Sequence, residues 1–144
     1  MSDTDTASWA ALLRVHAALV PLIDRELQAA TGLPLTWYDV LLELNSAPGR
    51  RLNMGELGDV AVVSRTRASR VVDHMVVAGL VSREPNPDDR RSSYATITEA
   101  GRARLRAAAP AYLAAIRRHF TSRMTTAESG AVVAALAKVL AARP

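Results

Sequence analysis

The chain has 144 residues, which is enough for one domain. It contains no cysteine, so disulfides, thiol catalysis and cysteine-ligated metal sites are excluded. Its net charge of +4 is too small to predict a nucleic-acid partner without local clusters. The polar, acidic N-terminus does not resemble a signal peptide, and no apolar run reaches the roughly 18 residues of a membrane span, so we expect a cytoplasmic protein.

Two helices are predicted near the N-terminus. Residues 1–7 are polar and should be flexible. From Trp9 to Leu27 apolar side chains recur at steps of three and four, which predicts a helix with one apolar face that ends before Pro34. A second helix over residues 37–44 can be capped by Thr36.

Two more helices follow in the middle of the chain. Asn53 can cap a short helix that ends near residue 61, and Ser64 can cap a helix over residues 65–78. Gly79 provides the left-handed residue that commonly ends a helix. The short segment between the two helices is typical of a helix-turn-helix.

A hairpin and two further helices complete the prediction. Residues 80–85 and 93–97 should be extended strands around a turn-rich loop. Thr98 can cap a long helix, and a last helix begins at Thr125 or Thr126. Three helices followed by a hairpin form a winged helix-turn-helix, so we predict a mainly α protein with a small β-hairpin wing.

Basic residues are concentrated after residue 49. Residues 1–49 contain two basic and six acidic side chains, whereas residues 50–106 contain eleven and seven. Seventeen of the eighteen basic residues are arginine, which prefers bidentate contacts with phosphate and guanine. A GC-rich genome would produce the same bias, so composition alone does not decide between the two explanations.

The helix predicted over residues 65–78 has the side chains of a DNA-reading helix. Its apolar side consists of Ala68, Val71, Val72, Met75 and Val76. Its polar side consists of Thr66, Ser69, Arg70, Asp73 and His74, flanked by Arg65 and Arg67. Arginines and hydroxyls at a helix N-terminus favour phosphate and base edges in a major groove. The alternative interpretation is a solvated helix face.

The hairpin tip carries the sequence Asp88-Asp89-Arg90-Arg91. An exposed arginine at such a tip can enter a minor groove, where the negative potential attracts it. We expect Asp89 to hold the loop by bonding a neighbouring amide or arginine. The alternative interpretation is a solvated turn.

Residues 86–101 resemble the wing of the MarR family of transcription regulators. Asp89 and Arg91 match the family's Asp-x-Arg pair, and Ile97, Thr98 and Gly101 match the strand end and helix start that follow. Upstream, Ser64-Arg-Thr-Arg-Ala-Ser-Arg-Val-Val-Asp73 resembles the family's recognition helix. The resemblance covers residues 8–142.

The resemblance implies a homodimeric regulator that binds a pseudo-palindromic site in double-stranded DNA, most often as a repressor. Residues 8–34 and 99–142 would form the dimerisation helices, and residues 35–98 the DNA-binding lobe. The long apolar stripes of the terminal helices independently favour a partner chain. A two-fold dimer would read half-sites about one helical turn apart.

The side chains expected to contact DNA lie on the helix and the hairpin tip. Bases would be read by Thr66, Ser69 and Arg70, phosphates or adjacent bases would be contacted by Ser64, Arg65 and Arg67, and the wing would supply Asp89, Arg90 and Arg91. The alternative function is a helical dimer whose winged lobe docks protein. A steep salt dependence of duplex binding would distinguish DNA binding from protein docking.

The family often responds to small aromatic or anionic ligands. Candidate ligand-binding residues are Trp9, Arg14, His16, Trp37 and Tyr38, which could equally be packing residues. The three histidines share no metal-ligand spacing, and no cofactor or catalytic motif occurs. We therefore expect neither an enzyme nor a metal sensor.

Overall fold

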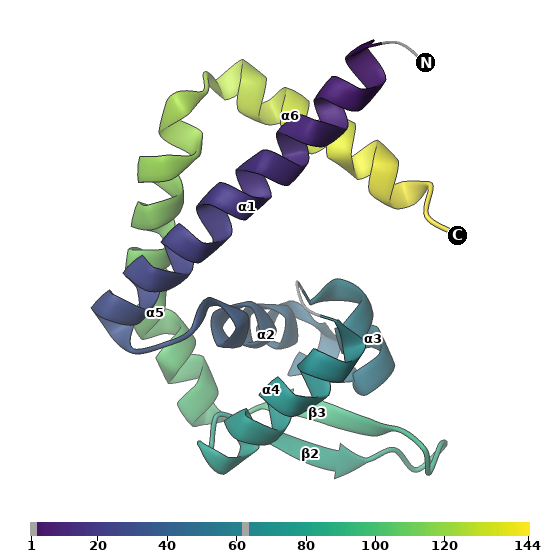
Figure 1. Ribbon diagram of the computed structural model, residues 1–144. Coiled ribbons are helices and arrows are strands. Elements are labelled where there is room, and N and C mark those ends of the chain that lie inside the picture. The colour runs from purple at the N-terminus through teal and green to yellow at the C-terminus, as the bar shows by residue number, and fades with distance from the viewer. Residues whose placement is uncertain (1–2, 62–63) are drawn as a thin grey trace. The chain divides into compact units, whose positions relative to one another are not determined.

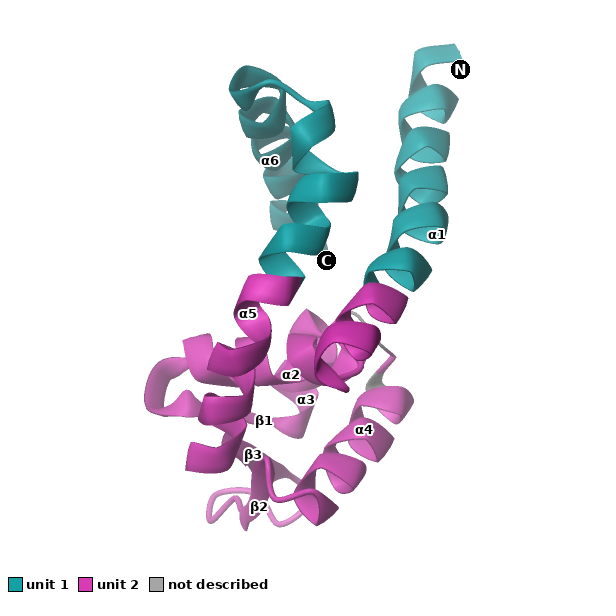
Figure 2. Ribbon diagram, turned by 90° about the vertical axis from the view of Figure 1, so that its left-hand side faces the viewer, with its two compact units in different colours: residues 1–23, 112–144 teal, residues 24–111 magenta. Residues whose placement is uncertain are grey.

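A computed structural model describes residues 3–61 and 64–144 of the chain, apart from the side chain of Arg65. The chain divides into two compact units. Unit 1 contains residues 1–23 and 112–144, and unit 2 contains residues 24–111 (Figure 2). The two longest helices each begin in one unit and end in the other.

Helix α1 (Asp3–Thr31) begins earlier than its apolar pattern predicted. Residues 3–7 were expected to be loose but are helical. Asp3 and Asp5 in the first turn interact favourably with the positive end of the helix dipole. Thr6 Oγ1 also donates to the Asp3 carbonyl oxygen at 3.3 Å. These polar residues start the helix without contributing to its apolar stripe.

The length and composition of α1 are those that a membrane-spanning helix needs. It contains an 18-residue window with a mean hydropathy of 1.4, of which 6% is buried. The pair formed by residues 99–123 and 126–141, bent by 101°, passes the same criteria when taken together. Such helices are weak evidence for a membrane protein, because helices that pack against protein also have this composition.

Helix α2 (Leu35–Ser46) has a different cap from the one predicted. Thr36 lies inside the helix, and the N-cap residue is Pro34, whose side chain cannot accept a hydrogen bond. The backbone N–H of Leu35 instead donates to Asp24 Oδ1 at 2.9 Å. A carboxylate from α1 thus replaces the local side-chain cap.

A 3₁₀ turn η1 (Pro48–Arg50) and a short strand β1 (Arg51–Asn53) lead into helix α3 (Met54–Val60). Asn53 caps α3 as predicted: its side chain accepts from Glu56 N, and Glu56 bonds back to the Asn53 N–H. Val62 and Val63 of the predicted turn lie outside the described residues. Helix α4 (Arg65–Val77) follows.

The predicted hairpin is present as strands β2 (Val81–Pro85) and β3 (Ser93–Ile97). Figure 1 shows β2 and β3 side by side, and they belong to a three-stranded antiparallel sheet of order β1-β3-β2. The third strand, β1, was not predicted because three residues are too short to display an alternating pattern. Its Leu52 pairs with Ala95 of β3.

Unit 2 has a continuous apolar core. Its helices and strands contribute Leu27, Leu33, Val40, Leu41, Leu44, Leu57, Val72, Met75, Val81, Ala95 and Ile97, all under 9% exposed. Gly79 has a φ of 78°, so α4 ends in the left-handed residue that the sequence predicted. The fold is therefore the mainly α, winged helix-turn-helix architecture expected from the sequence.

Three elements complete the chain: helix α5 (Glu99–His119), a 3₁₀ turn η2 (Thr121–Arg123) and helix α6 (Thr126–Ala141). Thr125 caps α6 through a reciprocal pair of hydrogen bonds with Glu128. None of the residues of α6 is buried, although Leu136 and Val139 belong to its apolar stripe.

Candidate nucleic-acid interface

Helix α4 presents the polar face that the sequence predicted. Thr66, Arg67 and Arg70 are exposed, and Ser69 is half-buried. The opposite side consists of Ala68, Val71, Val72 and Met75, all buried. Val76 was assigned to the apolar side but is 37% exposed, because it lies at the edge of that stripe. The side chain of Arg65 lies outside the described part of the structure.

The N-terminus of α4 is capped by Ser64. Its Oγ accepts a hydrogen bond from Arg67 N at 3.2 Å. A serine hydroxyl that accepts from the backbone can still donate its own proton. Ser64 therefore fixes the first turn of the helix while its O–H remains available to an acceptor such as a phosphate oxygen.

The tip of the wing is held by hydrogen bonds from its backbone to one amide and one carboxylate side chain of the same loop. Asn86 Oδ1 accepts from Asp88 N at 3.0 Å, and Asp89 Oδ1 accepts from Arg91 N at 2.9 Å. The prediction that Asp89 holds the loop through a neighbouring amide is confirmed. Both Arg90 and Arg91 are exposed. The loop is thus ordered while its two arginines project into solvent.

The wing is also tied to helix α4, through a residue that the sequence did not indicate. Arg83 of β2 donates from Nη2 to Ser69 Oγ at 3.1 Å and lies 3.1 Å from Asp73 Oδ1. Ser69, expected to read bases, therefore already has a protein partner. The sequence did not indicate this contact, because Arg83 lies among successive exposed residues of β2 and matches no local motif.

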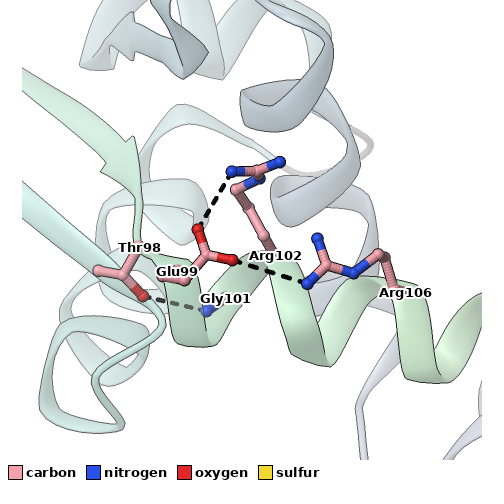
Figure 3. Close-up of polar contacts among 5 residues, drawn as sticks. All are labelled: Thr98, Glu99, Gly101, Arg102 and Arg106. Carbon is pink, nitrogen blue, oxygen red and sulfur yellow. Dashed lines mark hydrogen bonds and ion pairs between the residues drawn. The ribbon is translucent and has the colours of Figure 1, made fainter.

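A polar joint at the start of helix α5 contains Thr98, Glu99, Gly101, Arg102 and Arg106 (Figure 3). Thr98 Oγ1 donates to the Gly79 carbonyl oxygen at 2.7 Å and accepts from Gly101 N at 3.0 Å. Glu99 directly follows Thr98, and its carboxylate pairs with Arg102 at 3.1 Å and Arg106 at 3.6 Å (Figure 3). The joint anchors α5 where the wing begins.

The five candidate ligand-binding residues are divided between the two units. Trp9, Arg14 and His16 are exposed on the part of α1 that belongs to unit 1. In unit 2, Trp37 is half-buried and Tyr38 is buried in the core. The sequence therefore grouped side chains that the structure assigns to separate bodies.

Unit 1 contains a cavity of about 460 Å³. It is lined by Arg14, Val15, Ala18, Leu19, His119, Phe120, Arg123 and Met124. Arg14 is thus a candidate ligand-binding residue that faces a cavity. The surface of the cavity is almost entirely apolar, so it suits an apolar or aromatic group, and Arg14 and Arg123 line it mainly with the aliphatic parts of their side chains.

Helix α4, the three-stranded sheet and the arginine-tipped loop together define a winged helix-turn-helix protein. A sequence model of the MarR family matches residues 31–92. A MarR family transcriptional regulator from Streptomyces coelicolor, solved in complex with DNA, has a TM-score of 0.86 and 30% identity, covering 100% of this chain and 91% of that one. The chain belongs to the MarR family of transcriptional regulators.

Other relatives agree with this assignment. AbsC, a MarR family regulator of the same organism, has a TM-score of 0.81 and 30% identity, covering 99% of this chain and 98% of that one. The transcriptional repressor MprA of Escherichia coli K12 is 31% identical over 81 residues, which are 56% of this chain. The match spans 46% of MprA, less than half of that repressor.

Proposed function

We propose that the chain is a homodimeric, sequence-specific double-stranded DNA-binding repressor that blocks a promoter. The observation that carries the proposal is that unit 2 presents the hydroxyls and arginines of α4 together with an ordered, arginine-tipped wing. The similar Streptomyces regulator solved with DNA supports the choice of ligand. The resemblance to MprA supports repression as the direction of regulation.

Each polar group has a distinct proposed contact. Thr66, Ser69 and Arg70 face base edges in the major groove, where arginine pairs with guanine and hydroxyls pair with several bases. Phosphates or adjacent bases are contacted from the first turn of α4 by Ser64, Arg65 and Arg67. The wing, braced by Asp89 and carrying Arg90 and Arg91, follows the minor groove.

A homodimer explains the exposed apolar side chains of unit 1. No residue of α6 is buried, and Val133, Val139 and Leu140 are more than half exposed. On α1, Trp9 is 62% exposed. Contiguous apolar surface of this kind is typical of a protein interface. Two copies would place two reading helices on a pseudo-palindromic site.

Release from DNA by a small molecule is the regulatory part of the proposal. The proposed effector is a small aromatic or anionic molecule, and the apolar cavity in unit 1, which Arg14 and Arg123 help to line, is its proposed site. The other candidate side chains, Trp9, His16, Trp37 and Tyr38, remain predicted contacts. If a ligand lowers the affinity of the protein for DNA, DNA must lower the affinity of the protein for that ligand by the same factor.

The decisive experiment is the selection of bound sites from random duplexes, followed by affinity measurements at several salt concentrations. We expect an enriched pseudo-palindrome and a steep salt slope, because each neutralised phosphate releases a counterion. Arg91→Ala should weaken binding to that site at least about five-fold without changing the dimer mass. Arg25→Ala, an exposed arginine of unit 2 on α1, is the matched control.

If no sequence were enriched among the random duplexes selected at low salt, this result would contradict sequence-specific binding. Duplex binding without a salt slope would also contradict it and would favour the protein-docking function. Equal affinities of Arg91→Ala and the wild type would show that Arg91 does not contribute to DNA binding.

A further inference from the structure

Arg83 lies between the wing and helix α4. From strand β2, its Nη2 donates to Ser69 Oγ at 3.1 Å and to the Ser69 carbonyl oxygen at 3.3 Å. The same nitrogen lies 3.1 Å from Asp73 Oδ1. One guanidinium nitrogen has two hydrogens, so three acceptors share them. Arg83 is therefore committed to α4 and does not project from the wing as Arg90 and Arg91 do.

Asp73 creates an electrostatic problem for a DNA-binding helix. It lies one turn after Ser69 on the polar face of α4, and its side chain is 63% exposed. Duplex DNA carries about one negative charge per 1.7 Å of helix axis. A carboxylate without a cation beside it on this face would repel phosphates. The Arg83 guanidinium, at ion-pair distance, supplies the opposite charge.

The contact with Ser69 has a second consequence. Because Ser69 Oγ accepts from Arg83, its own hydrogen points away from that guanidinium and can be donated. An outward donor suits acceptors such as guanine O6 and N7, thymine O4 or a phosphate oxygen. The same donor does not suit the amino group of cytosine, which is itself a donor.

We propose that Arg83 is a positioning residue of the DNA-binding surface, which neutralises Asp73 and orients the Ser69 hydroxyl as a donor. This inference rests on the proposed function. It assigns Arg83 an effect on DNA affinity that is exerted through Asp73 and Ser69. A direct phosphate contact by Arg83 is the competing role, and a double-mutant cycle separates the two.

The experiment measures the affinity of the wild type and four variants for the duplex selected by the wild type. Arg83→Ala should weaken binding at least about five-fold, because it leaves the Asp73 carboxylate uncompensated near phosphates. Asp73→Asn should bind no more weakly than the wild type. The double variant should bind more tightly than Arg83→Ala, since the uncompensated charge is gone, and the part of the loss that remains measures the orientation of the Ser69 hydroxyl. Arg106→Ala, which breaks an ion pair on α5, is the control and should leave affinity unchanged.

Three results would overturn the inference. A double variant as weak as Arg83→Ala would show that Arg83 does not act by neutralising Asp73. An Arg83→Ala variant with wild-type affinity would leave the residue without influence on binding. A loss of affinity for Asp73→Asn equal to that of Arg83→Ala would show that binding requires the contact between Arg83 and Asp73 and not the neutralisation of the Asp73 charge.

Separate control measurements distinguish a variant that fails to fold from one that folds but binds DNA weakly. Each variant is compared with the wild type by circular dichroism and thermal midpoint, and Arg83→Gln replaces Arg83→Ala if the latter unfolds. The same affinities are expected of it, because glutamine also lacks the charge. A wild type that binds no duplex overturns the proposed function and this inference with it. A wild type that binds, with variants that fail the cycle, overturns the inference alone.

Discussion

Gly101 is the residue at which helix α5 approaches the start of the wing most closely. A Cβ at this position would overlap the Leu80 carbonyl oxygen and lie 2.9 Å from Ile97 Cγ1. This carbonyl belongs to the backbone and accepts a hydrogen bond from Thr98 N at 3.1 Å, so it cannot move without disturbing that bond. Gly101→Ala should therefore destabilise the fold by about 1–3 kcal/mol, as overpacking of a core does, measured by urea unfolding.

The matched control for this substitution is Gly55→Ala. Gly55 is an exposed glycine in α3, where a Cβ would lie 3.4 Å from Asn53 Oδ1, an ordinary contact. Alanine is favoured over glycine in helices by up to about 1 kcal/mol, so this variant should be as stable as the wild type or more stable. Equal stabilities of the two variants would show that the backbone around Gly101 can shift to make room for a Cβ atom.

Glu43 is the residue whose titration should affect stability. Burial, followed by the like charge of Asp39 one turn earlier, raises the pKa of the Glu43 carboxyl above 4.5. A raised pKa means that the fold favours the neutral acid. The stability that Glu43 contributes is therefore fully present below pH 4.5 and is lost as the pH rises through its raised pKa.

The variant Glu43→Gln tests this sign. Glutamine removes the charge at neutral pH, so the variant should be more stable than the wild type at pH 7, with about 0.2–0.5 kcal/mol coming from the relieved repulsion by Asp39. The gain should disappear below about pH 4, where Glu43 is neutral in both the folded and unfolded protein. Unfolding curves between pH 3 and 8 would show it, and a gain that persisted at pH 3 would assign it to packing.

At the scale of the element, the start of helix α2 depends on a residue of α1. Asp24 Oδ1 accepts from Leu35 N at 2.9 Å, and its Oδ2 accepts from Gln28 at 2.9 Å. Asp24→Ala would leave the N–H at the start of α2 without this partner and should cost about 1 kcal/mol, as the loss of an N-cap does. Asp24→Asn keeps an acceptor oxygen and should recover most of that loss in the same unfolding assay. A loss as large in Asp24→Asn would assign the effect to charge.

This cap also shows what the sequence could and could not predict. Helix α4 was predictable because its cap, its apolar period and its terminal glycine all lie within fifteen residues of chain. Asp89 was predictable because an Asx turn is local. Asp24 and Arg83 were missed because each contacts a different secondary-structure element, and neither a cap motif nor an apolar period marks such a contact. Strand β1 was missed because three residues are too few to display an alternating pattern. Local sequence patterns therefore located the candidate site, whereas the contacts that brace it depend on the tertiary fold and could not be predicted from the sequence.

At the scale of the whole molecule, the exposed stripe of α6 should determine the oligomeric state. Val139 is 66% exposed in a helix with no buried residue. Val139→Glu would place a charge where we propose that a second copy packs, and an unpaired buried charge is strongly unfavourable. The variant should run as a monomer in sedimentation or light scattering. Val77→Glu is the matched control, because Val77 is 89% exposed on α4 of unit 2 and its replacement should leave the mass unchanged.

Loss of the dimer should also reduce DNA binding, although Val139 lies outside the proposed interface with DNA. Two linked DNA-binding lobes bind about 10²–10⁴ times more tightly than one lobe, without any new contact. A monomeric Val139→Glu should therefore lose at least about 100-fold in affinity for the full pseudo-palindrome and much less for an isolated half-site. A variant that stays dimeric would remove α6 from the interface. A monomer that retained the full affinity would show that one helix and one wing are sufficient for recognition.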